Sequence, residues 1–385
     1  MVNGPGPELG AARLFADRYG RPPEVVWYAP GRVNLIGEHT DYNDGFALPF
    51  AIGAGVCVAA ATRGDGVLAL SSRQEGGDVL TVPVAALKPG LPGGWAAYPA
   101  GMAWALLSAG HQIGGASLAI DADLAAGAGL SSSAALECAA GLALTGLYRL
   151  DVPRPDLAAL GRRAENDFAG APTGLMDQLA VLLGQAGHAL LLDCRTGTPE
   201  AVPLDPAAAG LVLLIINTGV KHELTDGGYA ARRMACEDAA RALGARSLRD
   251  ITGTGPLDRL ADPVLRRRAR HVVTENRRVL DTARLLRAGQ LSRAGPLLTA
   301  SHASLRDDFE VSWPEADAAV AAALAAGALG ARMTGGGFGG SVIALAPAGA
   351  ADEVAAAVTA RFAGQGWRAP AITPAQPAQG ARQLS

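Results

Sequence analysis

The order of the apolar segments is the sequence feature that most restricts the fold of this chain. Alternating or β-branched runs predict strands at 25–29, 47–61, 117–120, 188–192, 211–216 and 341–346. Helical periodicity predicts helices at 95–107, 131–147, 155–169, 175–183, 229–245, 262–309, 314–326 and 351–362. These elements do not follow one another in a regular βαβ succession, so the pattern favours an α+β protein over a doubly wound parallel sheet.

The length of the chain indicates two domains. It has 385 residues, and domains typically hold about 100–200 residues each. Residues 203–210 are rich in proline and alanine and show no strong period, which is typical of a domain junction. We therefore expect an N-terminal domain at 1–205 and a C-terminal domain at 206–385.

Composition and charge argue against several classes of function. The formal net charge is −3 and only 5% of residues are aromatic, so a nucleic-acid partner is not expected. The longest apolar run, Ala47–Thr62, contains proline and is shorter than the roughly 18 residues of a membrane-spanning helix. The four cysteines form no CxxC pair, and the N-terminus lacks the features of a signal peptide. We expect a cytoplasmic protein with reduced thiols and no membrane partner.

The segment Pro30–Gly45 is the densest polar cluster in the N-terminal half of the chain. It contains Arg32, Glu38, His39 and Asp41 between two apolar runs. A polar small molecule such as a sugar needs several donors and acceptors held in one place. A solvated hairpin loop would have a similar composition, so residue content alone leaves both interpretations open.

A second cluster, Gly127–Ala135, opens a long apolar helix. Its glycines allow backbone N–H groups to approach a ligand, and a helix N-terminus carries unpaired donors and positive partial charge. These features suit phosphate binding, and the serine hydroxyls add donors and a possible Mg²⁺ ligand. Serine N-capping after a glycine turn is the alternative explanation.

Two further segments carry chemically useful residues. The run Gly335–Gly340 fits G-x-G-x-x-G, but a strand follows it where a dinucleotide-binding fold requires a helix, so we reject a dinucleotide site. Neither a P-loop nor the motifs of protein kinases are present. The last segment contains Glu165 and Asp177, and Asp177 stands in the first turn of a predicted helix. From the residues alone, stabilisation of that helix is the simpler explanation for the aspartate.

Taken together, these segments resemble the galactokinase family of the GHMP small-molecule kinase superfamily. The family's sugar-binding motif corresponds to Gly31–Asn43, its phosphate loop to Gly127–Ala135 and its third motif to Met333–Gly340. The segments 165–178, 270–276 and 301–312 are also similar to the family. The resemblance spans nearly the whole chain.

The resemblance implies a role for each matching position. Asp177 would be the general base for the C1 hydroxyl of the sugar, and Arg32 would hold that carboxylate ionised and neutralise charge on the transferring phosphoryl group. The residues implied to bind galactose are Glu38, His39, Asp41, Gly174 and Tyr229. Those implied to bind ATP are Gly127, Ala128, Gly129, Leu130, Ser131, Ser132, Ser133, Trp95 and Tyr98, and those implied to hold Mg²⁺ are Ser133 and Glu165. The run Gly335–Gly337 would pack against the phosphate loop and the sugar.

The resemblance also implies a fold and partners. The fold would be the two-domain GHMP kinase fold of the α+β class. A ribosomal-protein-S5-like N-terminal α/β domain would carry the first two motifs and the catalytic aspartate, and a ferredoxin-like C-terminal domain the third motif. The reaction would convert galactose and ATP, with Mg²⁺, to galactose 1-phosphate and ADP, and the protein would be a monomer. Two alternatives stay open: a kinase for a related sugar such as N-acetylgalactosamine or arabinose, and a sensor that binds galactose and ATP without catalysis.

The chain departs from the family pattern at a few positions. Ala125 stands where proline is usual, and Thr173 stands where cysteine is frequent; we expect little effect from either. The C-terminus is rich in proline, alanine and glutamine, a composition typical of disorder. The resemblance instead implies a final strand that ends in the stretch Gly380–Leu384, and we expect that strand.

Overall fold

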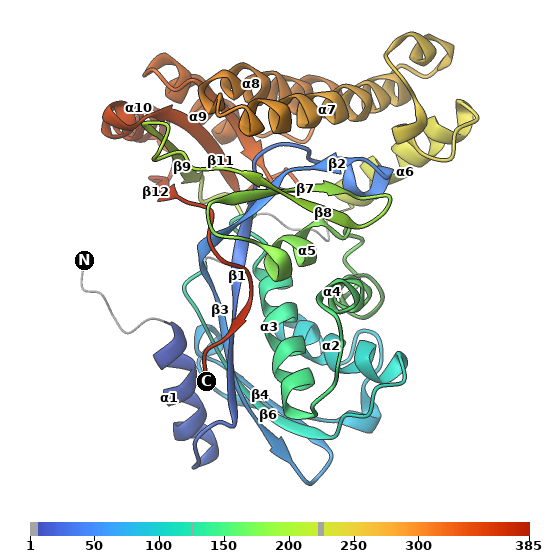
Figure 1. Ribbon diagram of the computed structural model, residues 1–385, viewed down its shortest axis with the longest axis vertical. Coiled ribbons are helices and arrows are strands. Elements are labelled where there is room, and N and C mark those ends of the chain that lie inside the picture. The colour runs from blue at the N-terminus through green and yellow to red at the C-terminus, as the bar shows by residue number, and fades with distance from the viewer. Residues whose placement is uncertain (1–6, 125–126, 222–226) are drawn as a thin grey trace.

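The computed structural model describes residues 7–124, 127–221 and 227–385 (Figure 1). Ala125 lies outside the described residues. Strands and helices are mixed, and the described part of the chain forms three sheets.

The largest sheet is built around two long antiparallel strands. Its strand order is β13-β1-β3-β6-β4-β5, and all its neighbouring pairs are antiparallel except β4 and β6. The strands are β1 (Val25–Asn34), β3 (Pro49–Arg63), β4 (Val67–Ser72), β5 (Val79–Pro83), β6 (Gly115–Ala122) and β13 (Arg382–Gln383). β1 and β3 run the length of the lower half of the molecule in Figure 1.

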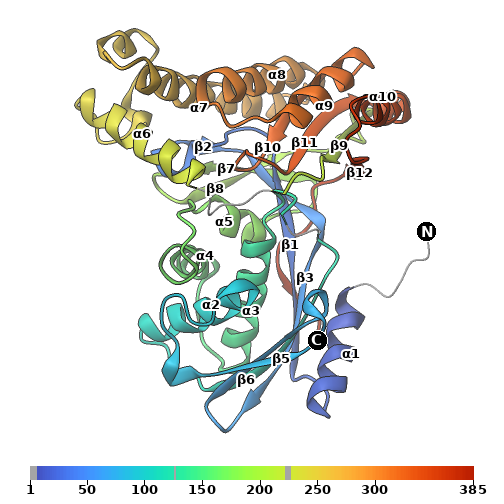
Figure 2. The same cartoon turned by 180° about the vertical axis from the view of Figure 1, so that it is seen from behind.

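Helices cover both faces of this sheet. Helix α1 (Pro7–Tyr19) lies on one face, where Phe15 packs with Cys57 and Ala59 (Figures 1 and 2). The helices on the other face are α2 (Ala97–Ser108), α3 (Ser132–Leu147), α4 (Arg154–Arg163) and α5 (Met176–Leu183). Helix α3 is apolar on nearly every side and lies in the core, because a helix without a polar face has no surface that favours water.

A second sheet carries the third motif. Its order is β10-β11-β9-β12, and every neighbouring pair is antiparallel. The strands are β9 (Leu211–Asn217), β10 (Gly330–Thr334), β11 (Ser341–Pro347) and β12 (Ala371–Ala375). The helices near it are α6 (Gly228–Ala242), α7 (Pro263–Arg287), α8 (Gly295–Ser304), α9 (Pro314–Ala325) and α10 (Ala351–Gly364). Two glycines, Gly335 and Gly337, have φ angles of 92° and 82° in the turn between β10 and β11, a conformation that glycine adopts without strain.

A small third sheet lies between the other two in Figure 1. Its order is β2-β7-β8, with β2 (Phe46–Ala47), β7 (His188–Asp193) and β8 (Thr198–Pro203). The main apolar core continues across it: Leu190 of β7, Leu213 of β9 and Ile343 of β11 belong to the same buried cluster as the strands of the large sheet.

The expected final strand is present. β13 pairs with β1 through Trp27 and Gln383, so the C-terminus returns to the large sheet near the beginning of the chain. The tertiary pairing overrides the composition of this segment, because β1 offers an edge whose backbone groups need partners. The predicted domain boundary after residue 205 stays a prediction, and a single cut there assigns β13 to the second domain although it lies in the first sheet.

Most of the predicted helices and strands lie where periodicity placed them. The helix expected at 155–169 differs in its last part, because α4 ends at Arg163 and a π-helical turn, η5 (Ala164–Ala169), follows. The expected helical stretch 262–309 is divided into α7, α8 and a second π-helical turn, η9 (Leu305–Phe309). π-helical turns are rare and frequently lie at functional sites, which directs attention to η5.

Candidate active site

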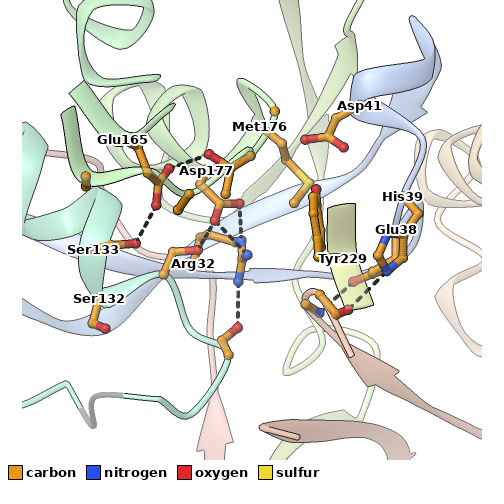
Figure 3. Close-up of a pocket in the computed structure, with 18 of the residues that line it drawn as sticks. Arg32, Glu38, His39, Asp41, Ser132, Ser133, Glu165, Met176, Asp177 and Tyr229 are labelled. Carbon is orange, nitrogen blue, oxygen red and sulfur yellow. Dashed lines mark hydrogen bonds and ion pairs between the residues drawn. The ribbon is translucent and has the colours of Figure 1, made fainter. Parts of the chain in front are cut away.

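A cavity of about 250 Å³ collects side chains from distant parts of the chain (Figure 3). It receives residues from β1 and the loop after it, from the glycine and serine loop before α3, from η5, from the start of α5, from α6 and from the third motif. The predicted site residues in its wall are Arg32, Glu38, His39, Asp41, Tyr98, Gly127, Gly129, Ser131, Ser132, Ser133, Glu165, Gly174, Asp177 and Tyr229.

Three predicted residues are not in the wall of this cavity. The carbonyl group of Ala128 accepts a hydrogen bond from Ser341 Oγ at 2.7 Å, and that of Leu130 accepts one from the backbone N–H of Arg32 at 3.1 Å. Trp95, in η4 (Gly94–Ala96), packs against the main apolar core. Their contacts with a nucleotide stay predictions.

Arg32 is directed into the cavity by an irregularity in β1. The register between β1 and β3 shifts between Pro30 and Arg32, and such a bulge re-aims the neighbouring side chains. Gly31 allows the approach of the next loop, because a Cβ at this position would lie 2.8 Å from the carbonyl oxygen of Leu130. Arg32 Nε lies 2.8 Å from Asp177 Oδ1 and Nη2 lies 2.9 Å from Oδ2. This pair is bidentate and more buried than a surface ion pair, since its side chains are only 6% and 19% exposed.

The loop before α3 presents backbone donors to the cavity. Gly127 and Gly129 both have φ angles of 73°, which lets the chain turn sharply into the helix. No side chain caps the N-terminus of α3, and the helix begins at the cavity wall. Free N–H groups at a helix N-terminus can bind an anion, so this geometry is compatible with the phosphate-binding role of the loop, which stays a prediction.

The third motif packs directly on this loop. A Cβ on Gly335 would lie 3.1 Å from the carbonyl oxygen of Gly129, and one on Gly340 would lie 3.2 Å from that of Ala128. The predicted packing of this motif against the loop is therefore confirmed. Glycine suits both positions, because a Cβ would make an unusually tight backbone contact and because their φ angles of 92° and 105° strain other residues.

Glu165 is the second residue of η5 and takes part in a buried hydrogen-bond network. Ser133 Oγ donates to Oε1 at 2.9 Å, while Thr173 Oγ1 and Gln178 Nε2 donate to Oε2 at 2.6 and 2.9 Å. Gln178 Nε2 also donates to Oε2 of Glu137, a fully buried acid, at 3.0 Å. Burial raises the pKa of Glu165, and the hydrogen bond from Thr173 opposes this rise.

Sequence reasoning missed Glu137 and Gln178 and expected little from Thr173. Glu137 stands in an apolar helix and Gln178 beside Asp177, and neither matches a recognisable catalytic pattern. Their roles depend on how α3, α5 and η5 pack, which a sequence pattern does not specify.

Glu38 is held by the residues around the third motif. Arg332 is fully buried and forms an ion pair with the Glu38 carboxylate, whose Oε1 also accepts a hydrogen bond from Gly335 N at 3.0 Å. Arg332 Nη2 lies 3.9 Å from Glu275 Oε1 as well. Burial raises the pKa of Glu38, and the charge of Arg332 opposes the rise. Arg332 was also missed, since a single arginine beside a glycine motif does not indicate a partner.

His39 forms hydrogen bonds through both ring nitrogens. Nδ1 lies 2.8 Å from the hydroxyl of Tyr42, and Nε2 lies 3.1 Å from the carbonyl oxygen of Gly336. Because a carbonyl oxygen only accepts, Nε2 carries a proton in this arrangement, and Nδ1 can accept from Tyr42. The ring also packs against Tyr229, with 5.2 Å between ring centroids.

Asp41 faces the cavity beside Gly174. A Cβ on Gly174 would lie 1.7 Å from Asp41 Oδ2, so this position has no room for a side chain. Burial raises the pKa of Asp41 to about 6; the negative charge of Asp177 adds to the rise and Arg32 opposes it. Asp41 and Asp177 are thus two acids in one cavity with different surroundings, as Figure 3 shows.

The cavity combines an anion-binding helix start, an arginine and a carboxylate that can accept a proton. Phosphoryl transfer requires mainly positioning and charge stabilisation, which these groups provide. The second half of the cavity, with Glu38, His39, Asp41 and Tyr229, offers several polar groups to a hydroxyl-rich molecule. The geometry is suited to the transfer of an anionic group to a hydroxyl.

Comparisons with known proteins agree with this geometry. Residues 13–62 match a family model described as a galactokinase galactose-binding signature. Residues 97–185 match the GHMP kinases N terminal domain, and residues 282–364 match the GHMP kinases C terminal model. A galactokinase from Streptomyces coelicolor is 49% identical over 374 residues, which are 96% of this chain and 97% of the relative. The chain belongs to the galactokinase family.

Further comparisons support the family assignment and the fold. A galactokinase from Mycobacterium tuberculosis is 46% identical over 93% of this chain and 99% of its own length. A crystal structure of Lactococcus lactis galactokinase complexed with galactose matches with a TM-score of 0.92 and 35% identity, covering 97% of this chain and 98% of that chain. A mevalonate kinase structure, at 16% identity and a TM-score of 0.62, covers 92% of this chain and 99% of its own and shares the fold.

These comparisons confirm the predicted resemblance and the predicted α+β, two-domain GHMP fold. The site residues of this galactokinase-family chain stay predictions, because no comparison assigns them individually. Within the described ranges, no helix is both long enough and apolar enough to cross a bilayer.

Proposed function

We propose that this chain transfers the γ-phosphoryl group of ATP to the C1 hydroxyl of D-galactose, forming galactose 1-phosphate and ADP. The observation that carries the proposal is the bidentate pair of Arg32 and Asp177 at the uncapped start of α3. This pair provides a proton acceptor and a positive charge beside a phosphate-binding site. The 49% identity with a galactokinase supports the choice of sugar.

The reaction follows from the positions of these groups. The proton of the C1 hydroxyl moves to the Asp177 carboxylate, and the sugar oxygen forms a bond to the γ-phosphorus. The bond from that phosphorus to the β–γ bridging oxygen breaks, and its electron pair leaves on ADP. Arg32 forms a bidentate ion pair with Asp177 and lies close enough to offset negative charge as the phosphoryl group moves.

The ATP phosphates would lie against the loop from Gly127 to Ser133, most of which lines the cavity and which leads into the uncapped N-terminus of α3. Ser133 and Glu165 would hold Mg²⁺, since both offer the oxygen ligands that this ion prefers, and their oxygens are 2.9 Å apart. The described residues contain no group of three or more His, Cys, Asp or Glu side chains that could hold a metal ion. This is compatible with Mg²⁺, which is commonly bound by one or two carboxylates and substrate phosphates. When bound, the ion supplies charge neutralisation at the phosphates.

Galactose would be bound by the opposite half of the cavity. Asp41 faces the cavity beside Gly174, whereas Glu38 and His39 already bind Arg332 and Gly336 and keep only part of their hydrogen-bonding capacity. A buried polar pocket of this kind rejects sugars that leave its groups unpaired. The monomeric state and the cytoplasmic location stay predictions.

The test of this function is ADP release from the purified protein with ATP and Mg²⁺, across galactose, N-acetylgalactosamine, arabinose and glucose. We expect turnover with galactose and little with the other sugars. Turnover with N-acetylgalactosamine or arabinose instead would identify a kinase for a related sugar. No turnover with any sugar, in a protein that still binds galactose by calorimetry, would favour the sensor.

The pKa of Asp41 predicts how the affinity for galactose depends on pH. Above pH 6 the carboxylate is ionised and accepts hydrogen bonds from sugar hydroxyls, and below pH 6 it is protonated and loses acceptor capacity. The KM for galactose should therefore rise as the pH falls below 6, by up to about tenfold per pH unit. Steady-state kinetics from pH 5 to 8 measure this. The Asp41→Asn variant should have a high KM without this inflection, and the same inflection in that variant would assign it to another group.

Gly174→Ala should weaken galactose binding. The added Cβ would overlap the Asp41 carboxylate, which must then turn away from its place in the cavity. Loss of a hydrogen bond to a charged group costs about 1.5–3 kcal/mol, so the KM for galactose should rise by about 10- to 100-fold. Gly349→Ala is the control, because nothing lies within 4 Å of its new Cβ. An unchanged KM in Gly174→Ala would place the sugar away from Asp41.

A further inference from the structure

Ser131 stands between the phosphate loop and α3 in a backbone conformation that is uncommon for a serine. Its φ and ψ angles are 57° and 48°, in the left-handed region. A serine at this position usually caps the helix with its side chain, but Ser131 makes no such hydrogen bond. The phosphate-binding role predicted for this loop requires backbone donors and does not explain where the Ser131 hydroxyl is directed.

The hydroxyl of Ser131 is directed at Asp177. Ser131 Oγ lies 2.5 Å from Asp177 Oδ2, and because a carboxylate cannot donate, the serine is the donor. Arg32 Nη2 donates to the same oxygen, and Arg32 Nε donates to Oδ1. Each carboxylate oxygen has two lone pairs in the plane of the group. Both lone pairs of Oδ2 therefore accept hydrogen bonds from the protein. Oδ1 uses one lone pair for Arg32 and keeps the other for a substrate hydroxyl.

The side chain and the backbone of Arg32 both hold the backbone of the phosphate loop. Arg32 Nη1 donates to the carbonyl oxygen of Gly129 at 2.7 Å. The backbone N–H of Arg32 donates to the carbonyl oxygen of Leu130 at 3.1 Å. Ser131 is 8% exposed and its own carbonyl oxygen accepts from Ala135 N at 3.0 Å in the first turn of α3. The loop, the arginine and the base thus form one connected unit in which Ser131 supplies the direct link from loop to base.

We propose that Ser131 is a positioning residue for the base: by occupying Oδ2, it makes Oδ1 of Asp177 the atom that takes the proton from the sugar hydroxyl. The link also holds the base at a set position relative to the loop that binds the phosphates. This inference rests on the proposed function, since it concerns the base of that reaction. Small displacements of reacting groups lower rates strongly, so the effect of losing Ser131 should be on kcat.

Two substitutions at this position separate the hydroxyl from the backbone. Ser131→Ala removes the hydroxyl and keeps the cost of the left-handed backbone, and Ser131→Gly removes the hydroxyl and that cost together. Both variants should lower kcat by about 10- to 100-fold with little change in the KM for galactose or ATP. When Ser131→Ala or Ser131→Gly is combined with Asp177→Asn, kcat should not fall by a comparable further factor, because the base is already absent.

Other outcomes would overturn the inference. A Gly variant as active as the wild type would mean that only the backbone of Ser131 matters. A raised KM for ATP with unchanged kcat would make the hydroxyl a phosphate ligand alone. Galactose binding by calorimetry shows which variants are folded. If Ser131→Ala does not fold, the kinetics of Ser131→Gly decide whether the hydroxyl is required. Wild-type protein without galactose kinase activity would refute the proposed function and the inference with it, whereas an active wild type with fully active Ala and Gly variants refutes only the inference.

Discussion

Asp177→Asn should lower kcat by about 10²- to 10⁴-fold, the range for removal of a general base. The amide keeps the size of the side chain but cannot take the proton of the C1 hydroxyl at neutral pH. Galactose should still bind, because Glu38, His39, Asp41 and Tyr229 remain in the cavity wall. The measurement is steady-state ADP release, with galactose binding by calorimetry on the same preparation.

The control for this variant is Asp156→Asn. Asp156 also stands in the first turn of a helix, α4, but it is exposed and outside the cavity. If Asp177 served only to stabilise the N-terminus of α5, both variants would lose similar small amounts of stability and keep their activity. Near-normal turnover of Asp177→Asn would remove Asp177 from the role of base.

Arg32→Ala should lower kcat by about 10²- to 10³-fold, as removal of a group that stabilises transition-state charge does. The variant leaves the Asp177 carboxylate without its cation, and it also removes the Nη1 donor to the carbonyl oxygen of Gly129, which should loosen the phosphate loop. We expect a smaller rise in the KM for ATP than the fall in kcat. Arg32→Lys should recover only part of the rate, because one ammonium group cannot reproduce the bidentate contact of the guanidinium with Asp177 together with its hydrogen bond to Gly129.

Arg277→Ala is the matched control for this variant. Arg277 is paired with Asp281 but is 72% exposed, and exposed pairs contribute little. Its removal should leave kcat and both KM values unchanged. A change in the apparent affinity for galactose alone, without a fall in kcat, would make Arg32 a binding residue.

The sequence predicted much of the fold because the apolar pattern is strong. The long helix that became α3 is apolar on almost every side, and the run that became β3 is too broken by glycine and proline for a membrane helix. Patterns of this kind depend on near neighbours in the chain and can be read without the partner surfaces. The π-helical turn at Glu165 and the pairing of β13 with β1 were not encoded in such local patterns. They depend on tertiary contacts, and only the resemblance to relatives anticipated the final strand.

For the candidate site too, some features could be predicted from the sequence and others depended on the tertiary structure. The sequence by itself determined which segments are candidates for chemistry: the polar loop after β1, the serine loop before α3, the acid at the start of α5 and the third motif. Their residue types left structural explanations open, and the resemblance to the galactokinase family supplied the predicted roles. Only the tertiary structure decided which atoms meet. It placed the buried Arg332 on Glu38, Gln178 between Glu137 and Glu165, and the Ser131 hydroxyl on Asp177. Each of these contacts joins residues that are far apart in the chain or whose partner depends on how the helices pack, and local periodicity carries no information about such distances.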